Sequence, residues 1–263
     1  MRKASKRRTV EPYSILAFLY DRVMLHVDYR NWATYIDALV KKYSNPVGNI
    51  VDISCGTGTC CYYLNHLGYS VTGFDASKEM LKQARRKAQK KKSPIYFGCA
   101  GMTALPLRMS ANVVISLYDS INYLLYRTAW LACFKQVYHS LVPGGLFIFD
   151  VSTLYNSRTD FSNYIQNDKW DEGSYHRRSW FEESEGLQIN EFEIRLADHP
   201  GILWVERHIQ KIRSIAEIIH LIEHSNFTLV HAFKDFTFDS YSEGCERIHF
   251  VLEKQDGAYA GTS

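Results

Sequence analysis

The amino-acid sequence predicts an α/β fold in which a parallel sheet is covered by helices on both faces and carries a small inserted antiparallel β-meander. Three observations support this fold class. Short apolar runs alternate with helical segments from residue 31 to residue 151. A glycine-containing turn over 54–58 joins a strand directly to a helix. After Val151 the pattern changes to segments of alternating apolar and polar residues separated by turn-forming residues.

The first part of the chain contains the strand–helix alternation. Apolar and aromatic residues recur at helical spacing between Trp32 and Val40. Ser77 is a predicted N-cap, and the Pro-Gly-Gly stretch at 143–145 is predicted to stop a helix. The predicted elements are a helix over 31–43, a strand over 49–54, a helix over 59–67, a strand over 69–75, a helix over 76–92, strands over 93–99 and 112–118, a helix over 129–142 and a strand over 145–151.

The second part adds the meander and the end of the main sheet. Its predicted strands cover 174–183, 187–197 and 203–213, followed by a helix over 214–224 and strands over 227–236 and 246–254. The domain organisation expected from this order is a disordered basic tail over 1–12, a main domain with N-terminal lid helices over 13–151 and 213–254, an inserted β-subdomain over 152–212, and a flexible tail over 255–263.

Composition restricts the classes of protein that fit. A chain of 263 residues with 46% hydrophobic residues suits one large domain with an insertion. It has no apolar run of roughly 18 residues, and its basic N-terminus is not followed by an apolar segment, so neither a membrane span nor a secretory signal is predicted. The six cysteines show no paired metal-ligand spacing, so we predict no metal site and a reducing, cytoplasmic location.

The turn "SCGTG" at 54–58 predicts a ligand site. A strand that ends on glycines beneath a helix N-terminus forms a pocket lined by backbone amides, which an acceptor or anionic group can approach. Asp75 ends the next strand, 17 residues beyond Gly58, where a carboxylate can accept hydrogen bonds from vicinal ribose hydroxyls. A helix cap is the other explanation for Asp75. The pair predicts a nucleoside-binding site.

Five ordered motifs carry a resemblance to a known family: "VDISCGTG", "VTGFDASKEMLKQAR", "GMTALPL", "SLYDSINYLL" and "LVPGGLFIFDV". Together they resemble the class I S-adenosylmethionine-dependent methyltransferases over residues 13 to 253. The resemblance implies a Rossmann-like sheet of seven strands with the last strand antiparallel. The segments "FLYDRVMLHVDYRNWATYI" and "VERHIQKIRSIAEIIHLIEHSNF" look like the small-molecule branch that includes sugar N,N-dimethyltransferases, in which a β-insertion closes over the active site.

Residue by residue, the resemblance implies a cofactor site for S-adenosylmethionine. The glycine turn would hold the methionine end, Asp75 the ribose, and Met80 and Met102 the two sides of the adenine. Trp32 is a candidate lid or pocket aromatic, although packing of the first helix explains it equally well. The positions assigned to the cofactor are Tyr20, Trp32, Asp52, Ser54, Cys55, Gly56, Gly58, Asp75, Ala76, Met80, Gly101, Met102, Leu117 and Tyr118.

Two of these positions depart from the family pattern. Ser54 stands where the first small residue of the turn is usually glycine, and its side chain crowds the approach to the backbone. Gly101 stands where an acid usually accepts a hydrogen bond from the adenine amino group. Both departures leave open a relative that binds the cofactor without turning over.

Catalysis of methyl transfer needs alignment of the reacting atoms and, for a hydroxyl acceptor, a general base. The candidates for polar positioning are Tyr20, Asp119, Tyr123 and His208, each of which a packing or hydrogen-bonding role also explains. Tyr123 occupies a position that holds histidine in some sugar dimethyltransferases. Asp119 follows the fourth strand, at the sheet edge where open α/β sheets bind ligands.

The expected partner is a small-molecule methyl acceptor selected by the meander, with homodimerisation through the inserted sheet as the other use of that sheet. A nicotinamide-dependent oxidoreductase is disfavoured because Gly56 and Gly58 are not followed by a third glycine of GxGxxG. A nucleic-acid methyltransferase is disfavoured because "LYDS", and no base-flipping motif of the NPPY type, follows the fourth strand.

Overall fold

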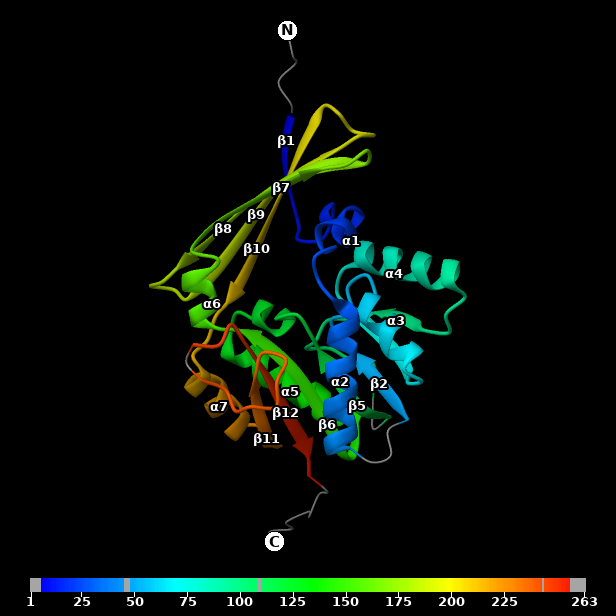
Figure 1. The fold of residues 1–263 in the computed structure, drawn as a ribbon, viewed down its shortest axis with the longest axis vertical. Helices are drawn as coiled ribbons and strands as arrows, with labels where there is room; N and C mark the ends of the chain where they lie inside the picture. The colour runs from blue at the N-terminus through cyan, green and yellow to red at the C-terminus, as the bar shows by residue number, and fades with distance from the viewer. Residues whose placement is uncertain (1–5, 45–47, 108–109, 243, 256–263) are drawn as a thin grey trace.

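Two β-sheets, one of seven strands and one of five, form the framework of the protein in the computed structural model (Figure 1). The structure describes residues 6–44, 48–107, 110–242 and 244–255. The larger sheet has the order β11-β12-β6-β5-β2-β3-β4. Its strands are β2 (Asn49–Asp52), β3 (Ser70–Asp75), β4 (Tyr96–Cys99), β5 (Ala111–Ser116), β6 (Leu141–Ser152), β11 (Phe227–Lys234) and β12 (Arg247–Lys254). Because β12 is antiparallel to β6 and β11 while β2 to β6 pair in parallel, the seven-stranded sheet with an antiparallel last strand is confirmed.

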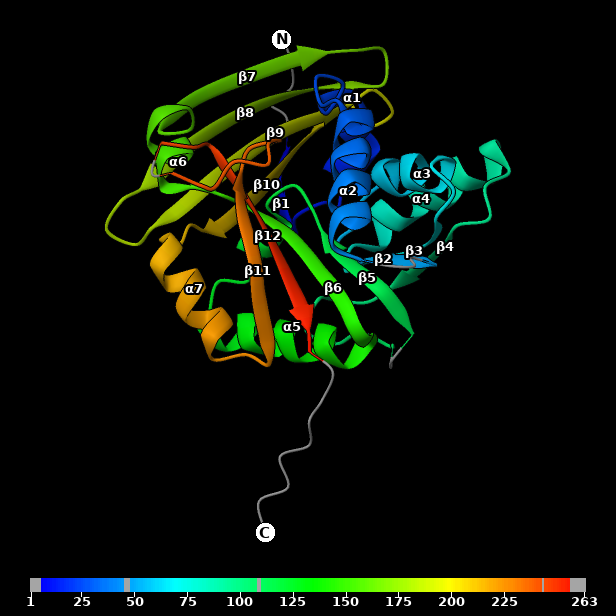
Figure 2. The same ribbon diagram turned by 60° about the horizontal axis from the view of Figure 1, so that its bottom comes forward.

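Helices cover both faces of this sheet because its strands are apolar on both sides. Ile50 of β2 packs in the cluster that contains Leu39, whereas the next residue, Val51, packs in the opposite cluster with Trp130. Figure 2 shows the two layers. They consist of α2 (Tyr29–Tyr43), α3 (Thr59–His66) and α4 (Lys78–Lys91) on one face, and α5 (Arg127–Ser140) and α7 (Ile215–Glu223) on the other.

Two predicted helix boundaries can be compared directly with the structure. Ser77 is the N-cap of α4, as predicted, because its hydroxyl accepts a hydrogen bond from the Met80 backbone amide at 3.2 Å. Contrary to the prediction, the Pro-Gly-Gly stretch at 143–145 does not end the preceding helix. Helix α5 already ends at Ser140, and the stretch lies within β6.

The smaller sheet has the order β1-β10-β9-β8-β7. Its strands are β1 (Lys6–Val10), β7 (Asn163–Lys169), β8 (Gly173–Glu182), β9 (Leu187–Leu196) and β10 (Ile202–Lys211). Strands β7 to β10 form an antiparallel meander, three of whose strands were predicted. β7 was not, because its sequence NYIQNDK is mostly polar and lacks the alternation of a half-buried strand.

The expectation of a disordered tail over 1–12 is wrong for residues 6–12. Residues 6–10 form β1, which pairs in parallel with β10 and so covers one edge of the smaller sheet. Arg7 reaches Glu193 of β9 at 2.7 Å, and the guanidinium of Arg8 lies 5.6 Å from the centre of the Trp204 ring. Arg7 and Arg8 therefore have partners across the sheet surface. Residues 1–5 and 256–263, the rest of the two predicted tails, lie outside the described residues.

The chain from β1 to α2 fills the space beneath the smaller sheet. The 3₁₀ helix η1 (Leu16–Phe18) and the short helix α1 (Tyr20–Val23) bury Leu16, Leu19 and Val23 against Phe192 and Ile194 of β9. Two further short helices, η2 (Ser120–Tyr123) and α6 (Leu154–Thr159), follow β5 and β6. In the described ranges, none of the helices is long and apolar enough to cross a membrane. The N-terminal segment thus joins the two sheets at the place where the site lies.

Candidate active site

The glycine turn after β2 adopts a conformation that requires its glycines. Gly56 and Gly58 have φ of +53° and +76°, in the left-handed region that side-chain-bearing residues rarely adopt. A Cβ on Gly58 would lie 2.6 Å from the Phe97 ring, so this glycine allows α3 to start close to β4. Gly56 instead lines a cavity. The two glycines therefore serve different purposes, close packing at 58 and open backbone at 56.

Asp75 at the end of β3 is fixed next to this turn. One carboxylate oxygen accepts a hydrogen bond from the Gly56 amide and the other from the Ser77 amide, both at 2.8 Å. Burial raises the pKa of Asp75, although these two amides pull in the opposite direction. Each oxygen keeps one further lone pair for a ligand hydroxyl. The carboxylate is thus oriented by the backbone and still able to bind a diol.

A cavity of about 300 Å³ lies beside the turn and Asp75, at the carboxyl ends of the parallel strands, and we name it the turn cavity. Its two methionines supply apolar walls, and Asp75 supplies a hydrogen-bond acceptor for sugar hydroxyls. Apolar walls and a carboxylate acceptor together fit a nucleoside. Of the predicted cofactor residues, it is lined by Tyr20, Ser54, Gly56, Asp75, Ala76, Met80, Gly101 and Met102.

Several lining residues of the turn cavity were not predicted. Glu11 and Pro12, which the sequence assigns to a disordered tail, form part of its wall because β1 carries them there. The remaining ones are Tyr13, Ile53, Ser77, Ser120 and Tyr123, the last of which was predicted only for catalysis.

Other predicted cofactor residues lie away from the turn cavity. The Trp32 ring is buried against Tyr118, at 5.6 Å between centres, and against Phe236 at 4.8 Å, so it belongs to the packing of α2. Cys55 and Leu117 are buried in the same hydrophobic core. Both residues follow the end of a strand, and they pack in the cluster that contains residues of α2, α3 and α4. The hydrophobic pattern alone does not distinguish this side from the cavity side.

Asp52 lies beneath the turn and is almost fully buried. Its carboxylate accepts hydrogen bonds from the Ser54 amide at 3.0 Å and from the Cys61 thiol at 3.5 Å. Burial raises the pKa of Asp52 to about 7, although the hydrogen bonds from Ser54 and Cys61 act against this shift. The carboxyl group therefore changes charge near neutral pH in the protein without ligands.

This pKa predicts a pH dependence of stability. Between pH about 4 and about 7 the folded protein binds the Asp52 proton more tightly than the unfolded chain, so the free energy of unfolding falls as pH rises through this window. The contribution has a slope of at most about 1.4 kcal/mol per pH unit. Urea denaturation of ligand-free protein from pH 5 to 7.5 should show a flatter profile for Asp52→Asn than for the unsubstituted protein. Parallel profiles would contradict the shifted pKa.

A second cavity, of about 100 Å³, lies between the main sheet and the smaller one, and we name it the inter-sheet cavity. All four predicted catalytic residues line it: Tyr20, Asp119, Tyr123 and His208. Tyr13, Tyr20, Ser120 and Tyr123 line both this cavity and the turn cavity. These four residues form the junction between the two cavities, where a group bound in one would meet a group bound in the other.

A chain of hydrogen bonds leads from the junction into the smaller sheet. The Tyr13 and Tyr123 hydroxyls are 2.7 Å apart, the Tyr123 hydroxyl is 3.0 Å from His208 Nδ1, and His208 Nε2 is 3.2 Å from a carboxylate oxygen of Glu206. An ionised carboxylate only accepts hydrogen bonds, so Nε2 carries the ring proton and Nδ1 accepts from Tyr123. The imidazole is thus oriented as a base toward the junction.

Glu206 is the functional residue that sequence reasoning missed. It is fully buried and also accepts hydrogen bonds from the backbone amides of Tyr13, Ile15 and Leu16 at 2.7, 2.5 and 2.8 Å. One carboxylate therefore holds both the N-terminal segment and His208. Glu206 and His208 are two positions apart in the sequence, which places them on the same face of a strand. This spacing is the sequence signal that could have linked Glu206 to His208.

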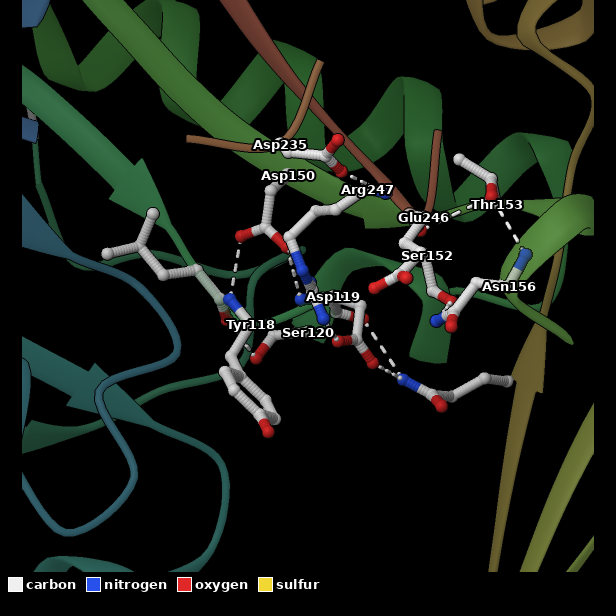
Figure 3. A network of polar contacts seen from close by, with 12 residues as sticks. Tyr118, Asp119, Ser120, Asp150, Ser152, Thr153, Asn156, Asp235, Glu246 and Arg247 are labelled. Carbon is white, nitrogen blue, oxygen red and sulfur yellow. Dashed lines mark hydrogen bonds and ion pairs between the residues drawn. The ribbon is translucent and has the colours of Figure 1, made fainter. Parts of the chain in front are cut away.

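Asp119 is not a free carboxylate, although it lines the inter-sheet cavity. One oxygen is 2.8 Å from an Arg247 guanidinium nitrogen, and the other accepts a hydrogen bond from Gln210 at 2.5 Å (Figure 3). Arg247 also bonds Asp150, which is fully buried at the end of β6. Burial alone would lower the pKa of Arg247, but Asp150 and Asp119 raise it above its usual value. The guanidinium therefore stays charged and holds both carboxylates.

The Asp150–Arg247 pair fixes the turn that follows β5. Asp150 accepts hydrogen bonds from the backbone amides of Tyr118 and Asp119 at 2.6 and 2.8 Å. These two residues have φ of +59° and +49°, a strained conformation for residues with side chains. Such strain persists only where the surroundings enforce it. The buried ion pair therefore positions the loop that leads to the junction residues Ser120 and Tyr123.

Comparison with known proteins gives consistent matches. Residues 50–145 match the family described as a methyltransferase domain. A protein of Geobacillus sp. (strain WCH70), provisionally named a methyltransferase, is 30% identical over 246 residues, which cover 92% of this chain and 99% of that protein. A dTDP-3-amino-3,6-dideoxy-alpha-D-glucopyranose N,N-dimethyltransferase of Streptomyces fradiae is 29% identical over 51% of this chain and 52% of its own. The crystal structure of an S-adenosylmethionine-dependent methyltransferase from Clostridium acetobutylicum ATCC 824 has the same fold, with a TM-score of 0.79 and 22% identity over 93% of this chain and 99% of that one.

Proposed function

The chain belongs to the class I S-adenosylmethionine-dependent methyltransferases, and we propose that it methylates a nitrogen or oxygen atom of a small molecule bound in the inter-sheet cavity. The single observation that carries the proposal is the junction of the two cavities at Tyr13, Tyr20, Ser120 and Tyr123. A cofactor in the turn cavity and an acceptor in the inter-sheet cavity would meet there, as an in-line displacement requires.

The turn cavity is the proposed cofactor site. Asp75 would accept hydrogen bonds from the ribose hydroxyls, Met80 and Met102 would enclose the adenine, and Gly56 would leave room for the methionine end beside the backbone. The bound cofactor supplies a methyl group activated by the positive charge of its sulfonium. Because that activation needs no help from the protein, the residues at the junction have to orient the acceptor and exclude water.

The chain from Tyr123 to Glu206 is the proposed route for the acceptor proton. Burial raises the pKa of Tyr123 well above its usual value, so its hydroxyl stays protonated and can pass a proton on to His208 Nδ1. Glu206 would stabilise the resulting imidazolium across the 3.2 Å contact. This arrangement serves a hydroxyl acceptor, which needs a base, and an ammonium acceptor, which must first lose a proton. The aminosugar named for the Streptomyces fradiae relative supports an amine as one acceptor class.

Methyl transfer to small molecules by the unsubstituted protein tests the function, and replacing Tyr123 by phenylalanine tests the proton route. The variant should transfer methyl groups at least about tenfold more slowly, because general base catalysis typically contributes a factor of about 10²–10⁴, while its affinity for S-adenosylhomocysteine stays within about threefold. The measurement is transfer of a labelled methyl group from S-adenosylmethionine to a panel of small amines and alcohols. Tyr126→Phe is the matched control, because that side chain is exposed and lines neither cavity. Equal rates in the two variants would contradict the proposed proton route.

Gly101→Asp should tighten cofactor binding. A Cβ at this position meets no atom within 4 Å, so the side chain enters open space in the turn cavity, where a carboxylate could accept a hydrogen bond from the adenine amino group. One added hydrogen bond of about 1 kcal/mol corresponds to several-fold higher affinity by calorimetry. Gly201→Asp is the control, since Gly201 is equally open but lies outside both cavities. Unchanged or weaker binding in Gly101→Asp would count against this placement of the adenine.

A further inference from the structure

Arg177 of β8 carries a positive charge in the wall of the inter-sheet cavity. It also lines an adjoining cavity of about 170 Å³. The two cavities lie side by side, because they share six lining residues: Met24, Tyr118, Asp119, Arg177, Asn190 and Gln210. An acceptor at the junction can therefore extend toward Arg177 and beyond it.

The guanidinium of Arg177 has only neutral partners. Its Nε donates to Ser179 Oγ at 3.0 Å and to Asn190 Oδ1 at 3.1 Å, and its Nη2 donates to Asn190 Oδ1 at 2.6 Å. In the described part of the chain, no carboxylate lies within 4.0 Å of it, and its Nη1 has no hydrogen-bond partner. Arg247, the other arginine of this space, is neutralised by Asp119 and Asp150. Of the two arginines among the described residues that line these cavities, Arg177 is thus the one without a counter-charge.

Three aromatic rings hold this guanidinium in place. Its central carbon lies 5.3 Å from the ring centres of Phe161 and Tyr164 and 5.5 Å from that of Phe192. Aromatic faces stabilise a cation and fix the plane of the guanidinium, which lowers the entropy lost when it binds a planar or tetrahedral oxyanion. A free donor edge on a preoriented guanidinium is the arrangement that recognises carboxylate and phosphate groups.

A second polar group points to the same ligand region. Gln188 lines the adjoining cavity and is 96% buried, and its Oε1 has no hydrogen-bond partner among the described residues. Leaving a buried acceptor unpaired is unfavourable, and a hydrogen bond from a ligand hydroxyl or ammonium group would remove this penalty. The carboxylates that line the adjoining cavity are Asp119, already paired with Arg247, and Asp160, which is exposed.

We propose that the methyl acceptor carries an oxyanion, a carboxylate or a phosphate, that binds Arg177 while its nucleophilic atom lies at the Tyr13–Tyr123 junction. This inference deepens the proposed function and depends on it for the identity of the acceptor. The remaining polar groups of the adjoining cavity, Gln188 and Asn156 among them, would bind hydroxyl or amino groups of the same molecule. Neutral amines and phenols of equal size would then be poor acceptors.

The test uses binding as well as activity. With the full-length protein saturated with S-adenosylhomocysteine, calorimetry should detect binding of benzoate or inorganic phosphate but not of benzamide, the neutral analogue. Arg177→Met should weaken oxyanion binding at least about tenfold, as expected for a charged hydrogen bond. Arg178→Met is the matched control, because this neighbouring arginine is exposed on the opposite face of the strand, and it should stay within twofold. The stronger of the two probes distinguishes a carboxylate site from a phosphate site.

Methyl transfer provides the second readout. Three amines of similar size are compared as methyl acceptors. Ethanolamine has no anionic group, β-alanine carries a carboxylate, and O-phosphoethanolamine carries a phosphate. Loss of oxyanion binding in Arg177→Met supports the anion site, whatever the rate of Tyr123→Phe. An unchanged rate of methyl transfer in Tyr123→Phe would count only against the proton route. Failure of both oxyanions to bind the unsubstituted protein, or equal binding by Arg177→Met, would overturn the anion site. Transfer to ethanolamine by the unsubstituted protein as efficient as transfer to β-alanine and O-phosphoethanolamine would overturn it as well, while leaving the proposed function intact.

Discussion

Arg247→Met should lower the free energy of unfolding by about 3–5 kcal/mol, a large effect for a single substitution. The guanidinium neutralises Asp119 and the fully buried Asp150, so methionine would fill part of the volume but leave two carboxylates without a counter-charge. The strained turn at Tyr118 and Asp119 would lose its support at the same time. Urea denaturation at pH 7, followed by tryptophan fluorescence, measures the change.

Two further variants separate the cost of leaving buried charges unpaired from the cost of losing an exposed ion pair. Arg7→Met removes an exposed pair with Glu193 and should cost less than about 1 kcal/mol. Adding Asp150→Asn to Arg247→Met should recover part of the lost stability, because one of the unpaired charges is removed. If Arg247→Met proved no more destabilising than Arg7→Met, the buried network would not be what supports the loop after β5.

Asp75→Ala should weaken S-adenosylmethionine binding by about 1.5–3 kcal/mol, or roughly 10- to 150-fold. The substitution removes a charged acceptor that lines the turn cavity, and it also removes the acceptor that orients the Gly56 and Ser77 amides. Isothermal titration calorimetry measures the loss of affinity, both for S-adenosylmethionine, which carries the positive sulfonium, and for S-adenosylhomocysteine, which does not.

Asp75→Asn and Asp28→Ala make the result interpretable. Asparagine keeps the shape and one acceptor oxygen, so its affinity should fall between those of alanine and the unsubstituted protein. Asp28 caps α2 outside both cavities, so its replacement should cost some stability but change cofactor affinity less than about twofold. Full affinity in folded Asp75→Ala would show that the ribose binds elsewhere.

The main sheet and the turn cavity could be predicted because their signals are local. The apolar run Ile50–Ile53 and the glycines Gly56 and Gly58 lie within ten residues, so the strand and its turn can be recognised from a short stretch of sequence. Asp75 ends the next strand, 17 residues beyond Gly58. The parallel order of the strands then brings Ser54, Asp75 and Met102 to one edge, where the structure has them line a single cavity.

The parts that could not be predicted depend on contacts between distant segments. Arg247 meets Asp150 across 97 positions, and Glu206 meets the Tyr13 amide across 193. The two-residue spacing puts Glu206 on the same strand face as His208, but it does not reveal that the N-terminal segment binds to this carboxylate. Asp119 follows the fourth parallel strand and lines a cavity, but only the fold reveals that Arg247 and Gln210 already occupy its oxygens.

The N-terminal strand β1 runs straight into Glu11, Pro12 and Tyr13, three residues that wall the turn cavity. With the cofactor in the turn cavity, as proposed, binding of the cofactor would oppose fraying of β1, and fraying would weaken binding by the same free energy. Amide hydrogen exchange at residues 6–10 would then report cofactor occupancy from outside the catalytic centre. A chain shortened by its first dozen residues would lose no reactive group and yet behave as a binding mutant.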